Sequence, residues 1–211
     1  MTSTTSASGE PARARAFDAT ALARIAVFAA IIAVLGLPGG FTVFGVVPIT
    51  AQTLGVMLAG AILGPRLGAA SVAVLLALVA VGMPLLAGGR GGFGVFFGPS
   101  AGYLLGWLVG AAVIGLIVHR AGRRPTLWRT AIGMLVGGIV VVYALGIPVQ
   151  ALITGLPLGA TALTSLAFLP GDLLKAALAT AIVLSLARAY PRAFSRTWTA
   201  QAVGQDLTRV P

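Results

Sequence analysis

Hydrophobic residues fill six runs along the chain, and the segments between the runs are short and polar or rich in glycine and proline. Apolar runs with so few charges are typical of helices that lie in a bilayer. The pattern predicts helices over residues 21–37, 49–63, 67–83, 100–119, 130–145 and 170–189. Because a backbone in lipid has to satisfy its own hydrogen bonds, we expect an all-α integral membrane protein with six transmembrane helices.

Three of the predicted connections, 38–48, 84–99 and 146–165, are long and rich in glycine or proline. Irregular backbone is tolerated at membrane depth only where other parts of the protein cover it. Because they alternate with the other connections of six crossings, we expect all three to lie on the outer side of the membrane and to form a ligand site that opens there.

Composition supports a lipid environment, because 58% of the 211 residues are hydrophobic and 9% are charged, with a mean hydropathy of +1.04. Residues 1–17 are polar and lack apolar periodicity, so we expect a disordered cytoplasmic tail there. Residues 18–192 are expected to form one six-helix membrane domain that binds the substrate. Residues 193–211 are expected to form a cytoplasmic C-terminal tail.

Arginines gather on one side of this topology, and Arg90 alone lies in a connection on the other side. By the positive-inside rule both termini face the cytoplasm, and the protein crosses the cell membrane several times. This topology explains the net charge of +10 better than nucleic acid does, since no basic groove with interleaved aromatic residues is present. The arginines on the cytoplasmic side are Arg13, Arg15, Arg24, Arg66, Arg120, Arg123, Arg124, Arg129, Arg188, Arg192, Arg196 and Arg209.

The inventory of reactive side chains is small, with no cysteine and a single histidine, His119. Disulfides, thiolate metal sites and thiol catalysis are therefore excluded, and His119 has no second histidine or carboxylate cluster with which to bind a metal. An intramembrane enzyme would need paired catalytic groups that the apolar runs do not supply. We expect neither an enzyme nor a bound metal or cofactor.

Asp172 is the acidic residue that lies inside an apolar run, and Lys175 follows it by one helical turn. The spacing places both side chains on one helix face. A charge in hydrocarbon costs roughly 2.5 to 3.5 kcal/mol, so the two should face the interior of the bundle. They form either a structural pair that neutralises itself or an anchor for a polar ligand.

Arg90 interrupts a run of glycines that includes Gly92, whose backbone can approach a ligand closely. A planar guanidinium there suits a carboxylate, although an arginine at headgroup level or a flexible loop would give the same pattern. Gln52 offers an amide for interhelical bonds or for a ligand. Tyr103 and Phe93, with neighbouring aromatic residues, could wall a pocket or belong to a membrane belt.

The small residues Ala26 and Ala30 are spaced four apart in the first run, as are Ala29 and Ala33. Such spacing permits close approach of another helix, either within the protein or from a membrane partner.

Four ordered motifs carry a resemblance to a known family: PITAQT at 48–53, LAGAILGPRLGA at 58–69, GMPLLAGGRGGFGVFFGPSAGYLLGW at 82–107 and FLPGDLLKAALA at 168–179. With these motifs the chain resembles the BioY family, the biotin-specific S components of energy-coupling factor transporters. The resemblance implies a six-helix protein that captures biotin from outside and docks on a membrane coupling subunit that carries two ATPases.

If the ligand is biotin, as the resemblance implies, its chemistry suggests hypotheses for individual residues, and which charged group faces which end of the ligand stays open. Asp172 would accept a ureido N–H of biotin, Lys175 would offset Asp172 and donate to the ligand, and Arg90, with Gln52 and Tyr103, would meet the carboxylate. By the resemblance, Ala26 and Ala30 would contact the coupling subunit. The segment 88–98 is dense in glycine and carries Arg90, so we predict that it closes over the ligand as a lid. Two alternatives remain: an S component for another small vitamin, and a membrane scaffold that transports nothing.

Overall fold

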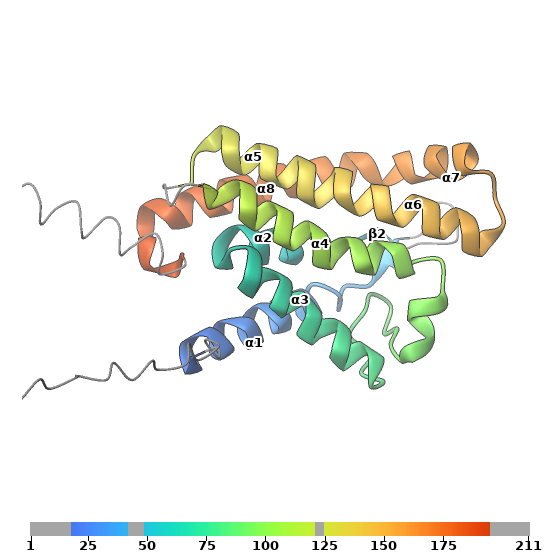
Figure 1. The fold of residues 1–211 in the computed structure, drawn as a ribbon, viewed down its shortest axis with the longest axis horizontal. Coiled ribbons are helices and arrows are strands. Elements are labelled where there is room, and N and C mark those ends of the chain that lie inside the picture. Colours follow the sequence, from blue (N-terminus) through green and yellow to red (C-terminus); the bar gives the residue numbers. More distant parts are fainter. Residues whose placement is uncertain (1–17, 42–48, 121–124, 195–211) are drawn as a thin grey trace, which may run out of the picture.

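The computed structural model describes residues 18–41, 49–120 and 125–194. The predicted N-terminal tail and most of the predicted C-terminal tail lie outside the described residues. Figure 1 shows a bundle of helices in which the described chain begins with α1 (Ala19–Val34) and, after α8 (Leu169–Ala189), ends at the same end of the molecule. The predicted all-α fold is confirmed. The described strands, β1 (Gly40–Phe41) and β2 (Ile49–Thr50), form one short antiparallel pair.

The first half of the bundle contains α1, α2 (Gln52–Leu63) and α3 (Pro65–Ala80), with ends a few residues from those predicted. The turn between α2 and α3 is tight because Gly64 adopts a φ of +85°, which glycine tolerates, and Pro65 opens α3 at its first position.

At the centre of the bundle lies α4 (Ala101–Val118), which packs against α2, α3, α5 and α6. Glycines on α4 make this packing possible. A Cβ at Gly106 would come within 2.9 Å of the Cα of Val142 on the facing helix. The small residues of α4 therefore let two helix backbones approach each other closely, as is common in membrane bundles.

The predicted end of the fifth helix at residue 145 is wrong. Helix α5 (Leu127–Leu135) runs through a π-helical segment (Val136–Val140) into α6 (Val141–Thr154). Pro148 lies inside α6 and does not end it. Proline is tolerated within membrane helices because neighbouring helices and local adjustments satisfy the backbone groups that it frees.

The predicted long connection over 146–165 is wrong as well. After α6 the chain turns at Gly155, with φ of +69°, and Pro157 caps the next helix, α7 (Leu158–Ser165). A short 3₁₀ segment, η4 (Leu166–Phe168), then joins α7 to α8. The connection 84–99 is irregular as predicted, apart from a β-bridge between Leu86 and Arg90 and the 3₁₀ helix η1 (Phe93–Phe97).

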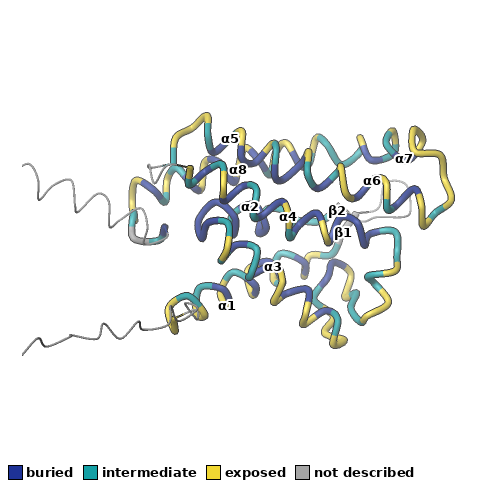
Figure 2. The backbone as a smooth tube through the Cα atoms, in the orientation of Figure 1, coloured by how far each residue is buried: buried dark blue, intermediate teal, exposed yellow. Residues whose placement is uncertain are grey.

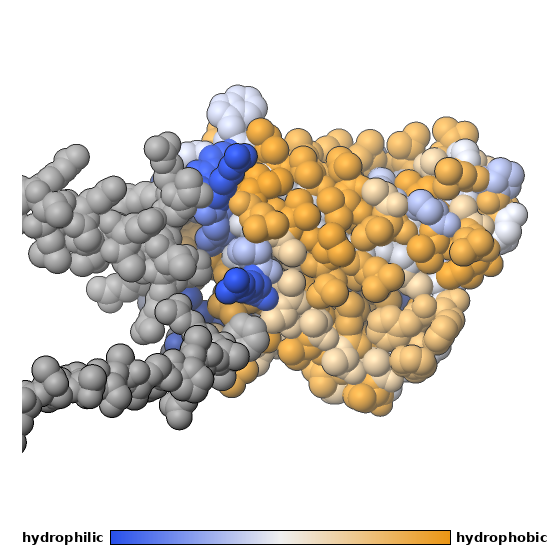
Figure 3. Space-filling model, viewed as in Figure 1, coloured by the Kyte–Doolittle hydropathy of each residue, from blue (hydrophilic) through white to orange (hydrophobic). Residues whose placement is uncertain are grey.

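The described residues contain three helical segments long and apolar enough to cross a membrane, Ala101–Val118, Leu127–Thr154 and Leu158–Ala189. Three shorter apolar helices, α1, α2 and α3, accompany them. The buried residues line the inside of the bundle (Figure 2), and the face seen in Figure 3 is hydrophobic along most of its length. Six crossings with both termini in the cytoplasm remain a prediction.

Candidate functional site

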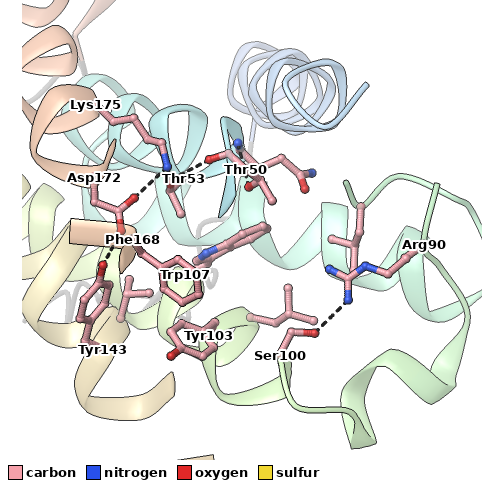
Figure 4. Close-up of a pocket in the computed structure, with 14 residues that line it drawn as sticks. Thr50, Thr53, Arg90, Ser100, Tyr103, Trp107, Tyr143, Phe168, Asp172 and Lys175 are labelled. Atoms are coloured by element: carbon pink, nitrogen blue, oxygen red, sulfur yellow. Dashed lines mark hydrogen bonds and ion pairs between the residues drawn. The ribbon is translucent and has the colours of Figure 1, made fainter. Parts of the chain in front are cut away.

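A cavity lies between α2, α4, α6 and α8 and the connection 84–99 (Figure 4). Charged residues stand at its two ends, and aromatic rings form the wall between them. The described residues that line it are Thr50, Gln52, Thr53, Leu86, Arg90, Ser100, Tyr103, Leu104, Trp107, Val142, Tyr143, Phe168, Asp172 and Lys175.

Asp172 and Lys175 form an ion pair at one end of the cavity. Lys175 Nζ lies 2.8 Å from Asp172 Oδ1 and donates a second hydrogen bond, of 3.1 Å, to Thr53 Oγ1 on α2. Tyr143 of α6 donates a 2.7 Å hydrogen bond to Asp172 Oδ2. Since Asp172 is 6% exposed, the pair faces the interior of the bundle as predicted, and its hydrogen bonds join α2, α6 and α8.

Arg90 stands at the other end of the cavity, where Figure 4 shows its guanidinium turned toward Ser100. Its Nη1 donates to Ser100 Oγ at 3.2 Å, and its Nε donates to the backbone carbonyl of Ala87 at 3.3 Å. Backbone bonds between Arg90 and Leu86 hold the same turn. Partial burial lowers the pKa of Arg90 from its usual value, but arginine stays protonated in proteins.

The charges of the described lining residues leave one net positive charge, because Asp172 balances Lys175 and Arg90 has no acidic partner among them. Trp107 and Phe168 lie between the two charged ends (Figure 4). A cavity of this kind suits an anionic ligand with a polar head, an apolar middle and a terminal carboxylate.

Tyr103 lines the cavity with its ring, while its hydroxyl is used elsewhere. The hydroxyl lies 2.8 Å from Gln150 Oε1 and 3.0 Å from Ser165 Oγ. The ring meets Tyr143 and Phe168 edge to face, with centroids 6.4 and 6.3 Å away. The structure therefore brings Tyr103 into the site as part of its wall, with the hydroxyl bonded to α6 and α7 and not to Arg90.

Gln52 also borders the cavity, but all of its amide groups bond to the backbone. Nε2 donates to the carbonyls of Ile32 (3.2 Å) and Leu85 (3.0 Å), and Oε1 accepts from the amide of Ala87 at 3.0 Å. These bonds are internal to the protein, and the side chain is 0% exposed.

Gly92 and Phe93 are not among the cavity-lining residues. The amide of Gly92 bonds to the carbonyl of Val79 at 2.8 Å. Phe93 is 65% exposed and packs against Phe97 in η1. The structure does not bring these two predicted residues to the cavity, and a lid role for the segment 88–98 stays a prediction.

The alanines of α1 divide between two faces. Ala26 and Ala30 are exposed, whereas Ala29 is buried in the core and Ala33 packs partly against it. The surface predicted to meet a coupling subunit, with Ala26 and Ala30, is therefore accessible. Ala29 and Ala33 pack inside the protein.

Ser100, Tyr143 and Phe168 line the cavity, although the sequence analysis gave them no role in a ligand site. The sequence does offer a reason to consider Tyr143, because its hydroxyl is a polar group within the apolar run 130–145. Among the described residues no group of three or more His, Asp or Glu side chains could hold a metal ion.

Comparison with known proteins gives consistent matches. The model of the BioY family matches residues 6–192. A probable biotin transporter BioY of Bacillus subtilis is 51% identical over 166 residues, which cover 78% of this chain and 89% of that protein. A biotin transporter BioY of Rhodobacter capsulatus is 47% identical over 182 residues, with 80% and 94% covered.

A solved structure agrees with the fold. The crystal structure of the S-component for biotin from an ECF-type ABC transporter superposes with a TM-score of 0.75 at 35% identity, covering 80% of this chain and 91% of that one. The chain is an integral protein of the cell membrane, and the match over residues 6–192 shows that it belongs to the BioY family.

Proposed function

We propose that this chain is the S component of a biotin uptake transporter, which captures biotin on the outer side of the membrane and delivers it across. The observation that carries the proposal is the cavity with one net positive charge, in which Arg90 lies at one end and the Asp172–Lys175 pair at the other. The similarity to proteins named as biotin transporters supports biotin as the ligand. Such a protein is a transport component and not an enzyme.

The hydrogen-bonding capacity of the charged pair fits the ureido ring of biotin. Lys175 has three N–H donors and uses two of them, on Asp172 and Thr53, which leaves one for the ureido carbonyl. Each carboxylate oxygen of Asp172 accepts one hydrogen bond, from Tyr143 or from Lys175, and retains a lone pair for a ureido N–H.

Arg90 fits the carboxylate of biotin, because a guanidinium has five N–H donors and only two of them are bonded to Ala87 and Ser100. The apolar rings of Trp107, Phe168 and Tyr103 would enclose the thioether ring and the aliphatic chain. Gln52 would then support the site through its backbone bonds, and Gly92 and Phe93 would lie outside it in the described conformation.

Transport would use partners, since the chain has no Walker A sequence with which to bind ATP. The exposed face of α1 with Ala26 and Ala30 is the surface that we propose for a membrane coupling subunit, which would connect the chain to two ATPases.

Equilibrium binding of tritiated biotin to the purified chain in detergent or nanodiscs tests this function. We expect saturable binding of one biotin per chain, and competition by excess biotin but not by riboflavin, thiamine or niacin. Competition by one of the other vitamins would favour an S component of different specificity, and no binding of any of them would favour a scaffold.

A further inference from the structure

We propose that Gln52 is a positioning residue that sets the place of Arg90 in the binding site, an inference that rests on the proposed function. Gln52 begins α2, and its side chain lies where α2, the end of α1 and the segment Leu85–Ala87 meet. It is fully buried, although it carries a polar amide.

The hydrogen bonds of the amide allow one orientation. Two carbonyls, of Ile32 and Leu85, require the NH₂ end of the amide, and the N–H of Ala87 requires the oxygen. A flipped amide would oppose like groups at all three places. Gln52 therefore recognises the backbone of α1 and of the segment 85–87 in a fixed register.

Ala87 joins this amide to Arg90. Its N–H donates to Gln52 Oε1 at 3.0 Å, and its carbonyl accepts from Arg90 Nε at 3.3 Å. Leu86, next to Ala87, exchanges backbone hydrogen bonds with Arg90. Ala87 is thus bonded to α2 through its N–H and to the guanidinium of Arg90 through its carbonyl. A shift of Ala87 relative to α2 would therefore also move Arg90.

Gly36 provides room for the amide. A Cβ at Gly36 would lie 2.9 Å from Gln52 Cδ and Nε2 and 2.9 Å from the carbonyl oxygen of Leu85. These are distances that real Cβ atoms do not reach, so an alanine there would push apart the groups that Gln52 holds together.

The test is a double-mutant cycle with biotin affinity as the first readout. Gln52→Met keeps much of the side-chain volume and removes all three hydrogen bonds, and we expect it to weaken biotin binding at least tenfold. Because Gln52 acts through Arg90, the same change in an Arg90→Ala background should cost less than a further twofold. Gly36→Ala should also weaken biotin binding at least tenfold in the wild-type background and less than twofold in the Arg90→Ala background, because it displaces the amide of Gln52. It replaces Gln52→Met in the test if that variant does not fold.

A second readout needs no biotin. The chain has no cysteine, and a Cβ at Gly94 meets nothing within 4 Å, so Gly94→Cys can carry a spin label in η1, the 3₁₀ helix that follows Arg90. We expect Gln52→Met to increase the mobility of this label. Ser71→Ala is the matched control, because Ser71 is buried but bonds only to the carbonyl of Leu67 in its own helix.

Unchanged label mobility and unchanged affinity in Gln52→Met would overturn the assignment of Gln52. A loss of affinity that is equally large with and without Arg90 would also overturn it, since Gln52 would then act independently of Arg90. If the wild-type chain binds no biotin, the proposed function fails, and the mobility of the label alone decides the role of Gln52.

Discussion

Tyr143 donates a 2.7 Å hydrogen bond to Asp172, so a hydroxyl from α6 fixes the carboxylate that α8 contributes to the cavity. The other oxygen of Asp172 is bonded to Lys175. Both oxygens of the carboxylate are thereby oriented before a ligand arrives, which reduces the ordering that binding has to impose.

Removal of the hydroxyl in Tyr143→Phe should weaken biotin binding about tenfold. A hydrogen bond to a charged group contributes ~1.5 to 3 kcal/mol, and the aromatic wall of the cavity is kept. Isothermal titration of the purified variant measures the change. Tyr190→Phe is the control, because Tyr190 is 56% exposed after the end of α8, and its affinity should equal that of wild type.

Asp172→Asn and Lys175→Ala should each weaken biotin binding 30-fold or more. Loss of one partner of a buried charge pair costs ~2 to 5 kcal/mol, because the remaining charge stays buried without its partner. Filter binding of tritiated biotin checks this result. Wild-type affinity in a well-folded Asp172→Asn protein would remove Asp172 from the site.

Arg90→Ala should discriminate between ligands that differ at the carboxylate. We expect it to weaken binding of biotin at least tenfold and to change binding of biotin methyl ester less than threefold, because the ester has no charge for Arg90 to meet. Competition against tritiated biotin gives both affinities. Equal losses for the acid and the ester would mean that Arg90 does not bind the carboxylate.

Trypsin provides a test of the predicted lid, because Arg90 is the only lysine or arginine in the connection 84–99. If the segment 88–98 closes over the ligand, biotin should slow cleavage after Arg90 severalfold. Cleavage after Arg66, which is exposed in the first turn of α3, is the internal reference and should not change. Equal rates at Arg90 with and without biotin would argue against a lid.

Larger side chains on the exposed face of α1 should reduce transport without reducing biotin binding. Ala26→Leu with Ala30→Leu should leave biotin affinity within twofold of wild type and reduce uptake at least tenfold in cells that supply the coupling subunits, because close helix contact needs small residues. Ala73→Leu, at an exposed position of α3, is the control for added bulk. Normal uptake by the double variant would exclude this face as the docking surface.

Sequence patterns predicted the parts of the structure that depend on local composition. Apolar runs located α1 to α5 and α8 but not the end of α6 or α7. The high cost of a charge in lipid singled out Asp172 and Lys175, which do face the cavity. Arg90 was found because its charge was isolated on one side of the topology, and it lies in the same cavity.

The remaining features depend on contacts between distant segments, which one sequence does not display. Pro148 suggested a helix end, but α6 continues through it to Thr154 in the packed bundle. Gln52 suited interhelical bonds as well as a ligand, and only the fold shows that three backbone groups from α1 and the segment 85–87 bond to its amide. Phe168 reaches the cavity because α7 and η4 replace the predicted loop.

The measurement that tests the central claim most directly is an experimental structure of the purified chain with bound biotin. We predict ligand density in the cavity between α2, α4, α6 and α8, with the ureido ring beside Asp172 and Lys175 and the carboxylate within hydrogen-bonding distance of Arg90. Biotin bound elsewhere on the protein, with this cavity unchanged, would contradict the account.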